Sequence, residues 1–171
     1  MKRHLDREIE NLKKKLLGVS AGFDFQQNDG GADPYLAFSA GVFGALPLAG
    51  EANPKGGDEL AFLAEYYHYD GGTKPSVANL VNQNDFLGEV AYYNKDLKLS
   101  VFGKFEMKKV ADDVNKAQNQ MWFGGGLKYY VLPGNNCNFT LAYNRIQFPD
   151  AASGAPDGQN DVTLQLQVFY Y

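Results

Sequence analysis

Apolar and polar residues alternate along most of this chain from Val19 onward. An alternation with a period of two places successive side chains on opposite faces of an extended strand. It is most regular from Leu97 to Lys108, where Leu, Val, Phe and Met occupy most odd positions and Lys, Ser and Glu most even ones. Runs of Gly, Pro, Asn and Asp separate such segments and indicate turns. The pattern predicts eight antiparallel strands, at residues 19–26, 35–46, 59–69, 86–93, 97–108, 120–131, 138–144 and 162–170.

The first residues follow a different pattern. Over residues 3–17, apolar side chains recur at helical spacing between charged ones, at Leu5, Ile9, Leu12 and Leu16. This predicts a short amphipathic helix that ends at Gly18. We therefore divide the chain into a helical extension, residues 1–17, and a β domain, residues 18–171. The start mixes basic and acidic residues and so differs from a secretory signal, and we expect the native start to lie elsewhere or export not to be encoded here.

Tyrosine doublets close several of the predicted strands. Tyr92-Tyr93 and Tyr129-Tyr130 stand directly before short turns, Tyr170-Tyr171 ends the chain, and Tyr66-Tyr67 falls at the opposite end of its strand. Aromatic rings with a polar tip collect where hydrocarbon meets water, and a membrane β-barrel repeats that boundary at the ends of its strands. One residue of each doublet lies on the apolar face. The expected membrane-interface aromatics are Tyr66, Tyr92, Tyr129, Tyr143 and Tyr170.

The connections between strands alternate in length. Counted back from the C-terminus, they run long, short, long, short and long, and the short ones fall on the same side as the C-terminus. Outer-membrane barrels have short turns on one side and longer loops on the other. The connection at residues 47–58 breaks this rule, through either a misplaced second strand or an inserted loop.

Composition agrees with a membrane sheet. The chain has 171 residues, enough for one domain, with 12 Phe and 11 Tyr. The chain has no run of about 18 apolar residues, so the sequence does not predict a transmembrane helix. A mean hydropathy of -0.38 is compatible with insertion because lipid-facing and inward-facing residues alternate in a barrel strand. We predict an all-β fold: an antiparallel transmembrane β-barrel of about eight strands with a short N-terminal α-helix.

Signals for other kinds of chemistry are weak. A formal net charge of -4 argues against nucleic acid as a partner. The single cysteine, Cys137, allows neither an internal disulfide nor a cysteine metal site. Neither His4 nor His68 neighbours a nucleophile, and Gly124–Gly126 lacks the Lys-Ser or Lys-Thr of a phosphate-binding loop. We therefore expect no enzyme, no cofactor and no metal.

The polar face of the predicted strands is where function would reside. It carries both charges, with acidic residues Asp24, Glu65, Glu89 and Glu106 and basic residues Lys98, Lys104, Lys108 and Lys128. In a water-filled pore, a column of ammonium groups favours anions. The alternative is that the lysines pair with Glu89, Glu106 and Asp24 inside a plugged small barrel. The candidate pore-lining residues are Lys98, Lys104, Lys108, Lys128, Glu89 and Asp24.

The C-terminal part resembles a known family. The stretches GGGLKYYVLPGNNCNFTLAYNRIQFPD and GQNDVTLQLQVFYY are similar to the end of the phosphate-selective porins of bacterial outer membranes. The match is carried by Gly126, Tyr129, Asn136, Leu141, Tyr143, Arg145, Leu164, Leu166 and Tyr170. The resemblance implies a porin that lets small anions such as phosphate diffuse across the outer membrane and that assembles as a homo-oligomer, a trimer.

The resemblance covers only the later half of such a porin, whose strands number about twice those predicted here. Tyr170, not Tyr171, falls on the apolar face, one residue out of step with the family, and the helix of residues 3–17 is foreign to it. A fragment or a fused reading frame would explain both the missing half and the foreign helix. The rival from another class is a soluble β-barrel that binds an apolar small ligand, which requires the apolar faces to point inward.

Overall fold

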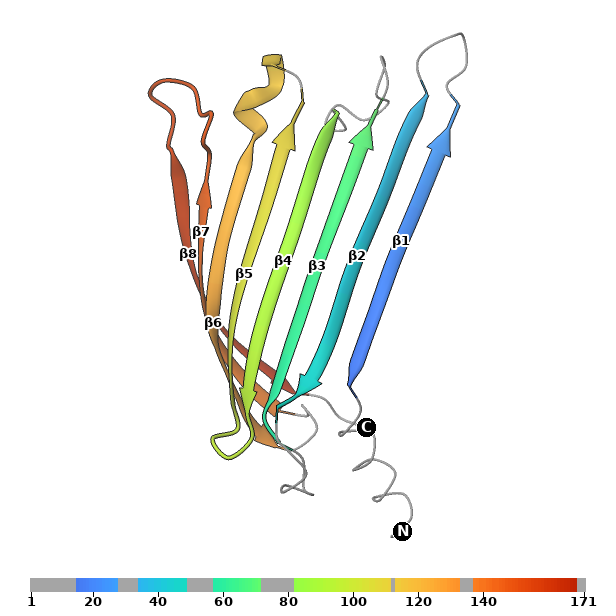
Figure 1. The fold of residues 1–171 in the computed structure, drawn as a ribbon. Helices are drawn as coiled ribbons and strands as arrows, with labels where there is room; N and C mark the ends of the chain where they lie inside the picture. Colours follow the sequence, from blue (N-terminus) through green and yellow to red (C-terminus); the bar gives the residue numbers. More distant parts are fainter. Residues whose placement is uncertain are drawn as a thin grey trace.

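A computed structural model describes residues 15–27, 34–48, 57–71, 82–111, 113–132 and 137–168. Over these residues the chain forms one antiparallel sheet of eight strands (Figure 1). The strands are β1 (Leu16–Gln26), β2 (Tyr35–Pro47), β3 (Glu59–Asp70), β4 (Gln83–Asn94), β5 (Leu99–Val110), β6 (Gln120–Leu132), β7 (Cys137–Gln147) and β8 (Gly158–Val168). A short 3₁₀ helix, η1 (Asp113–Gln118), lies between β5 and β6. The predicted eight strands and their order are confirmed.

Each strand pairs with the next one along the chain, so the sheet is a meander. The pairing is continuous apart from one irregularity between Tyr130 and Leu132, where β6 pairs with β7. The connections β1–β2, β3–β4, β5–β6 and β7–β8 lie at one end of the sheet, here called the loop end (Figure 1). The other end, with the β4–β5 and β6–β7 connections, is the turn end.

The connection between β2 and β3 also lies at the turn end, although it is long. Its base is closed by a hydrogen bond from the backbone N–H of Leu48 to the carbonyl oxygen of Asp58, at 2.8 Å. Because β2 lies where the alternation predicts it, the exception to the length rule is an inserted loop and not a misplaced strand.

The register places most apolar side chains of the eight strands on one face, here called the apolar face. Phe105 of β5 illustrates it, with the ring of Phe123 on β6 at 5.2 Å and that of Phe86 on β4 at 6.2 Å. No described residue covers this face. Its large exposed hydrophobic residues include Val19, Phe23, Phe25, Phe38, Val90, Val101, Phe123, Leu127, Phe139, Leu141, Val162, Leu164 and Leu166.

The opposite face, here called the inner face, carries the polar residues and is the more sheltered one. Apart from Gly44, the described strand residues that are buried face this side: Ala37, Gln83, Ser100, Val110 and Asn138. Only Ala37 and Val110 among them are hydrophobic. The described part of the chain therefore has no apolar core, and its sheet curves around its polar face.

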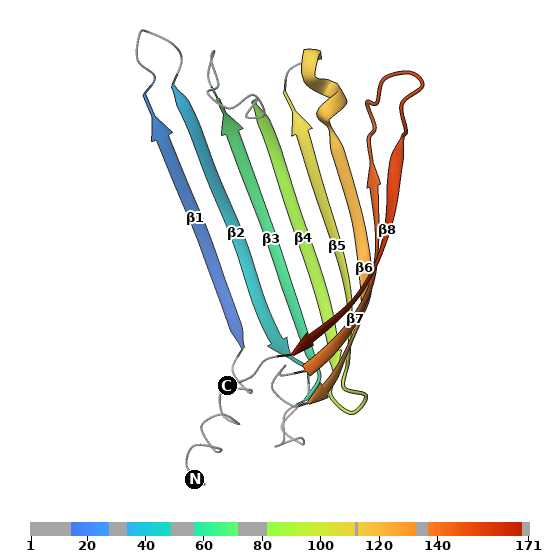
Figure 2. The same cartoon turned by 180° about the vertical axis from the view of Figure 1, so that it is seen from behind.

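The prediction that the strands close into a barrel is wrong for the described structure. β1 and β8 each pair on one side only, and β6 to β8 turn away from the plane of β1 to β5 without meeting β1 in the sheet (Figure 2). The inner face carries bulky side chains, whereas the interior of a closed eight-stranded barrel is already filled by side chains of ordinary size. A wider curve accommodates the bulky residues and leaves two free edges. The bulky inner residues include Phe43, Tyr67, Tyr69, Tyr93, Trp122 and Tyr130.

The predicted helical extension lies largely outside the described residues. β1 begins at Leu16, so Leu16 and Leu17 belong to the sheet, and Gly18 lies within β1 opposite Phe43 instead of ending a helix. The alternation of β1 therefore starts before Val19. Leu16 and Leu17 are compatible with the spacing of a helix and with that of a strand, so the sequence alone did not assign them to the sheet. No helix in the described segments is long and apolar enough to cross a membrane.

Candidate functional site

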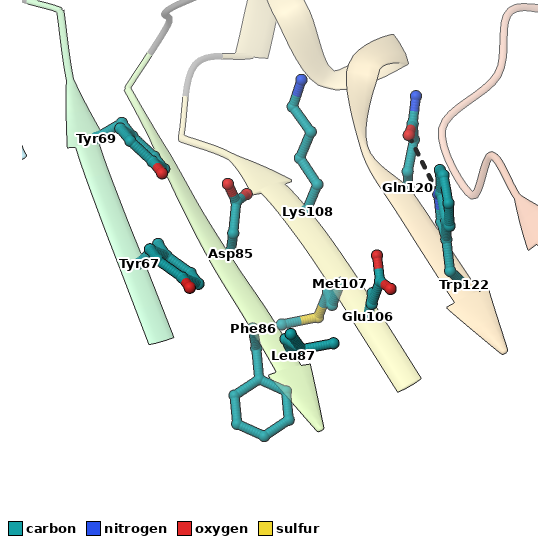
Figure 3. Close-up of a pocket in the computed structure, with 10 residues that line it drawn as sticks. All are labelled: Tyr67, Tyr69, Asp85, Phe86, Leu87, Glu106, Met107, Lys108, Gln120 and Trp122. Carbon is teal, nitrogen blue, oxygen red and sulfur yellow. Dashed lines mark hydrogen bonds between the residues drawn. The ribbon is translucent and has the colours of Figure 1, made fainter. Parts of the chain in front are cut away.

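The inner face contains a hollow of about 340 Å³ that spans β3 to β6 (Figure 3). Its polar and aromatic lining side chains are Tyr67, Tyr69, Asp85, Glu106, Lys108, Gln120 and Trp122. The rings of Tyr67 and Tyr69 lie parallel, with centroids 6.3 Å apart. Phe86, which also borders the hollow, points its ring to the opposite face, as the alternation of β4 requires. The hollow is thus a feature of the polar side of the sheet.

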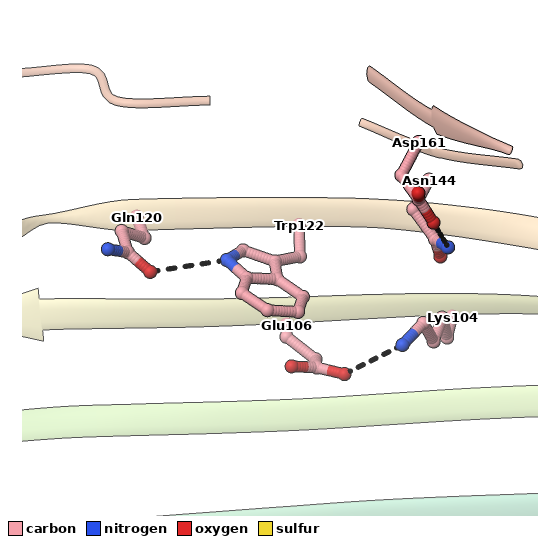
Figure 4. A network of polar contacts seen from close by, with 6 residues as sticks. All are labelled: Lys104, Glu106, Gln120, Trp122, Asn144 and Asp161. Atoms are coloured by element: carbon pink, nitrogen blue, oxygen red, sulfur yellow. Dashed lines mark hydrogen bonds and ion pairs between the residues drawn. The ribbon is translucent and has the colours of Figure 1, made fainter. Parts of the chain in front are cut away.

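Polar contacts beside the hollow join side chains along β5 and along β6 (Figure 4). Lys104 Nζ lies 3.1 Å from Glu106 Oε1 and 5.9 Å from the centre of the Trp122 ring. The indole N–H of Trp122 donates to Gln120 Oε1 at 3.3 Å. A Cβ atom on Gly124 would lie 3.0 Å from the Lys104 side chain. The absence of a side chain at Gly124 therefore leaves the room in which Lys104 lies along the sheet.

Four of the predicted pore-lining residues lie on the inner face of three neighbouring strands: Glu89 on β4, Lys104 and Lys108 on β5, and Lys128 on β6. Lys104 stands opposite Glu89 in the register, and Lys108 opposite Asp85. The ammonium group of Lys128 lies 5.7 Å from the centre of the Tyr130 ring. Each of the two β5 lysines therefore faces a carboxylate.

Two other predicted residues lie apart from this group. Asp24 is on the inner face of β1, at the edge of the sheet. Lys98 is not on the face of a strand: it closes the turn between β4 and β5, with a left-handed φ of 52°, and its N–H donates to the carbonyl oxygen of Lys95 at 3.2 Å. Lys98 therefore does not lie on the inner face of β5 as expected, and its pore-lining role stays a prediction. The turn uses residues 95–98, one more than the sequence pattern suggested, and the alternation continued through it by coincidence.

Carboxylates outnumber ammonium groups on the inner face. The described strands place seven acidic residues there, Asp24, Glu59, Glu65, Asp85, Glu89, Glu106 and Asp161, against three basic residues, Lys104, Lys108 and Lys128. Asp85 was missed by sequence reasoning because β4 was expected to begin at Phe86, whereas it begins at Gln83. The signal that could have found it is its spacing of four from Glu89, which keeps both residues on one face of a strand.

Four of the five expected interface aromatics lie on the apolar face, and three of their hydroxyl groups bond to polar residues near strand ends. Tyr66 donates to Asn84 Oδ1 at 2.6 Å and Tyr143 to Asn160 Oδ1 at 2.7 Å, both toward the loop end. Tyr92 donates to Asp58 Oδ2 at the turn end. Tyr129 also lies on this face, opposite Leu99 and Phe139. Tyr170 lies outside the described residues.

Asp58 joins the base of the β2–β3 connection to the neighbouring hairpin. Besides the hydroxyl of Tyr92, its carboxylate accepts the backbone N–H of Lys95 at 3.1 Å and the side-chain amide of Asn94 at 3.3 Å. These donors stabilise the charged form, so they lower the pKa of Asp58 below its usual value, the Tyr92 hydroxyl most and the Lys95 N–H next.

The described residues contain no group of three or more His, Cys, Asp or Glu side chains that could hold a metal ion. In comparison with known proteins, no family model, no curated protein and no solved structure matches the chain. The similarity to phosphate-selective porins therefore stays a prediction.

Proposed function

We propose that this chain forms the wall of a porin-like β-barrel in a bacterial outer membrane and has no enzymatic role. The apolar face contacts lipid, and the inner face lines a water-filled path for small hydrophilic solutes. The observation that carries the proposal is the row of large hydrophobic side chains exposed on one face of the sheet. Exposed apolar patches of this extent are rare on soluble monomers and indicate a membrane or a partner.

Strand length supports the same proposal. The strands have 11 to 13 residues. At about 3.3 Å per residue they are roughly 36–43 Å long. A tilt of about 45°, typical of membrane strands, reduces this to a height of roughly 25–30 Å, close to the hydrocarbon thickness of a bilayer. Tyrosine hydroxyls that turn toward strand ends, as those of Tyr66 and Tyr92 do, suit the two interfaces of such a layer.

The soluble alternative, a barrel that holds an apolar ligand, finds less support. It requires the apolar side chains to surround a cavity, whereas the hollow lies on the opposite face and is bordered by Asp85, Glu106 and Lys108. For the solute, the resemblance implies small anions such as phosphate, and the surplus of carboxylates on the inner face favours cations instead. The sign of the reversal potential distinguishes the two.

The single tryptophan tests which face meets lipid. Trp122 lies on the inner face, and its neighbour Phe123 lies on the apolar face with 42% of its surface exposed. In vesicles, we expect acrylamide in the water to quench the fluorescence of Trp122, and brominated lipid to quench it only weakly. In the double variant Trp122→Phe/Phe123→Trp, which keeps the composition of the chain, brominated lipid becomes the stronger quencher.

Two outcomes count against the proposal. If brominated lipid quenches neither protein, the sheet is not embedded in the bilayer. If it quenches Trp122 more strongly than Trp at position 123, the two faces are assigned the wrong way round.

A further inference from the structure

The two edges of the sheet are its least covered strands. Val19 on β1 and Leu164 on β8 have 81% and 77% of their surface exposed, the highest values among the large hydrophobic side chains described. Both strands also present one row of backbone N–H and C=O groups that no other described strand pairs with. If the sheet is embedded as proposed above, hydrocarbon cannot satisfy these groups, and a membrane sheet must have its edges paired.

We propose that two copies of this chain close one barrel, with β8 of each copy paired to β1 of the other. This inference rests on the proposed function, since in water an open edge is solvated. It also completes the site, because the inner face of a single copy borders a solute path on one side only.

Strand direction makes this pairing possible. The meander has an even number of strands, so β1 and β8 run in opposite directions. Two copies related by a twofold axis along the barrel therefore meet with β8 antiparallel to β1, and both keep their loop ends on the same side of the membrane. Antiparallel pairing of β1 with β1, or of β8 with β8, would instead invert one copy and place its loops on the opposite side.

The two edges also match in length and pattern. β1 and β8 each have eleven residues. On the apolar face, Val162, Leu164 and Leu166 would lie beside Val19, Ala21 and Phe23 of the second copy. In the same register, Thr163, Gln165 and Gln167 would lie on the inner face beside Gly22, Ser20 and Gly18. The seam then continues both faces of the sheet without placing a charge in lipid.

Closure by a second copy suits the observed curvature better than closure of a single sheet on itself. The inner face has bulky rings at Tyr67, Tyr69 and Trp122 that already border a hollow of about 340 Å³. An eight-stranded barrel leaves an interior that side chains fill, whereas sixteen strands leave an aqueous channel.

Cross-linking between two single-cysteine chains tests the seam. In a Cys137→Ser background, one chain carries Ser20→Cys and the other carries Thr163→Cys, Gln165→Cys or Gln167→Cys in turn, which samples registers that keep the inner face inward. We expect one of these mixtures, reconstituted together in vesicles and oxidised, to give a disulfide-linked dimer. Either variant alone should give none, because each seam joins β1 to β8.

Native mass spectrometry of the unmodified chain in detergent provides an independent measurement, and a mass of two chains is expected. A cross-link that forms within one chain carrying both cysteines, together with a single-chain mass, would show that the sheet closes on itself. Absence of a cross-link in every register, in vesicles where the tryptophan quenching shows an embedded sheet, overturns the dimer and leaves the proposed function standing. Failure of the quenching test removes both.

Discussion

Lys104 and Glu106 lie two residues apart on the inner face of β5, with the ammonium nitrogen 3.1 Å from the carboxylate oxygen. Both side chains are partly accessible, at 26% and 35% of their surface, so water still screens the pair. The pair nevertheless offsets the charge of the lysine that lies closest to the tryptophan. What remains on the described inner face is a surplus of carboxylates, and a surface of one sign raises the local concentration of the opposite ion.

We therefore expect a weak cation preference, opposite to what the resemblance to phosphate-selective porins implies. Under a potassium chloride gradient in planar bilayers, the reversal potential should have the sign of cation flow. The substitution Glu106→Gln should shift the reversal potential toward the sign of anion flow, because Lys104 then loses its compensating charge. Two unit charges at 4 Å interact by about 1 kcal/mol in water, so the permeability ratio should change by roughly several-fold.

The matched control is Asp157→Asn, which removes one carboxylate from the β7–β8 connection and none from the inner face. It should shift the reversal potential less than Glu106→Gln does. Equal shifts in the two variants would mean that the inner face of β5 does not line the path of the ions.

Close packing at one glycine gives a prediction about stability. A Cβ atom on Gly126 would meet the carbonyl oxygen of Leu141 and would lie 2.8 Å from the ring of Phe102. Backbone cannot give way as a flexible side chain does, so Gly126→Ala should lower the free energy of unfolding by about 1–3 kcal/mol. Gly103→Ala is the control, because its nearest neighbour, the carbonyl oxygen of Gly124, would lie 3.9 Å away. Urea unfolding followed by Trp122 fluorescence measures both, and equal losses would contradict the steric reason.

The alternation of the sequence predicted the strands and their faces because side-chain direction has a period of two, whatever the partner strand. Phe105 and Glu106, for example, lie on the apolar and inner faces as expected. Closure could not be predicted in this way. It depends on the curvature of the whole sheet and so on contacts between inner side chains of different strands, such as Tyr93 of β4 and Tyr130 of β6, that no local pattern contains.

The candidate site was predicted less completely than the fold. Lys104 and Lys108 lie on the inner face as expected, but the pairing of Lys104 with Glu106 depends on rotamers that a sequence does not specify. Lys98 was misplaced because a turn residue with positive φ is usually Gly or Asn, and a lysine there gives no signal.

The backbone of Lys98 gives a third prediction. A left-handed conformation costs an L-residue about 1–2 kcal/mol, and glycine escapes this at an entropic cost of about 0.5–1 kcal/mol. Lys98→Gly should therefore raise the free energy of unfolding by about 0.5–1 kcal/mol. Lys98→Val should lower it, because a β-branched residue tolerates positive φ poorly. Leu97→Gly, one residue earlier, is the control and should be destabilising, since Leu97 is not among the described residues with positive φ.

Lys98→Gly should also leave the reversal potential almost unchanged, and a large shift would place Lys98 in the path of the ions.

The carboxylate of Asp58 makes the turn end sensitive to acid. Its pKa is lowered in the folded protein by the hydroxyl of Tyr92 and the backbone N–H of Lys95. A carboxyl group whose pKa is lower in the folded than in the unfolded state stabilises the fold above its unfolded pKa. That contribution is lost as the pH falls through the folded pKa. The link between the β2–β3 connection and the β4–β5 hairpin should thus persist to a lower pH than a link through an ordinary aspartate.

Acid titration of the Lys95 amide resonance by nuclear magnetic resonance in detergent micelles measures this pKa, because that amide donates to Asp58. We expect its midpoint to lie below the usual aspartate value and to rise in Tyr92→Phe, which removes the strongest of the donors. Tyr93→Phe is the control: this side chain belongs to the same doublet, but Tyr93 faces inward, where its ring packs against Tyr130 at 5.2 Å, and it donates none of the hydrogen bonds described for Asp58. An equal rise in both variants would show that a general change at the turn end, and not the hydroxyl of Tyr92, sets the acidity of Asp58.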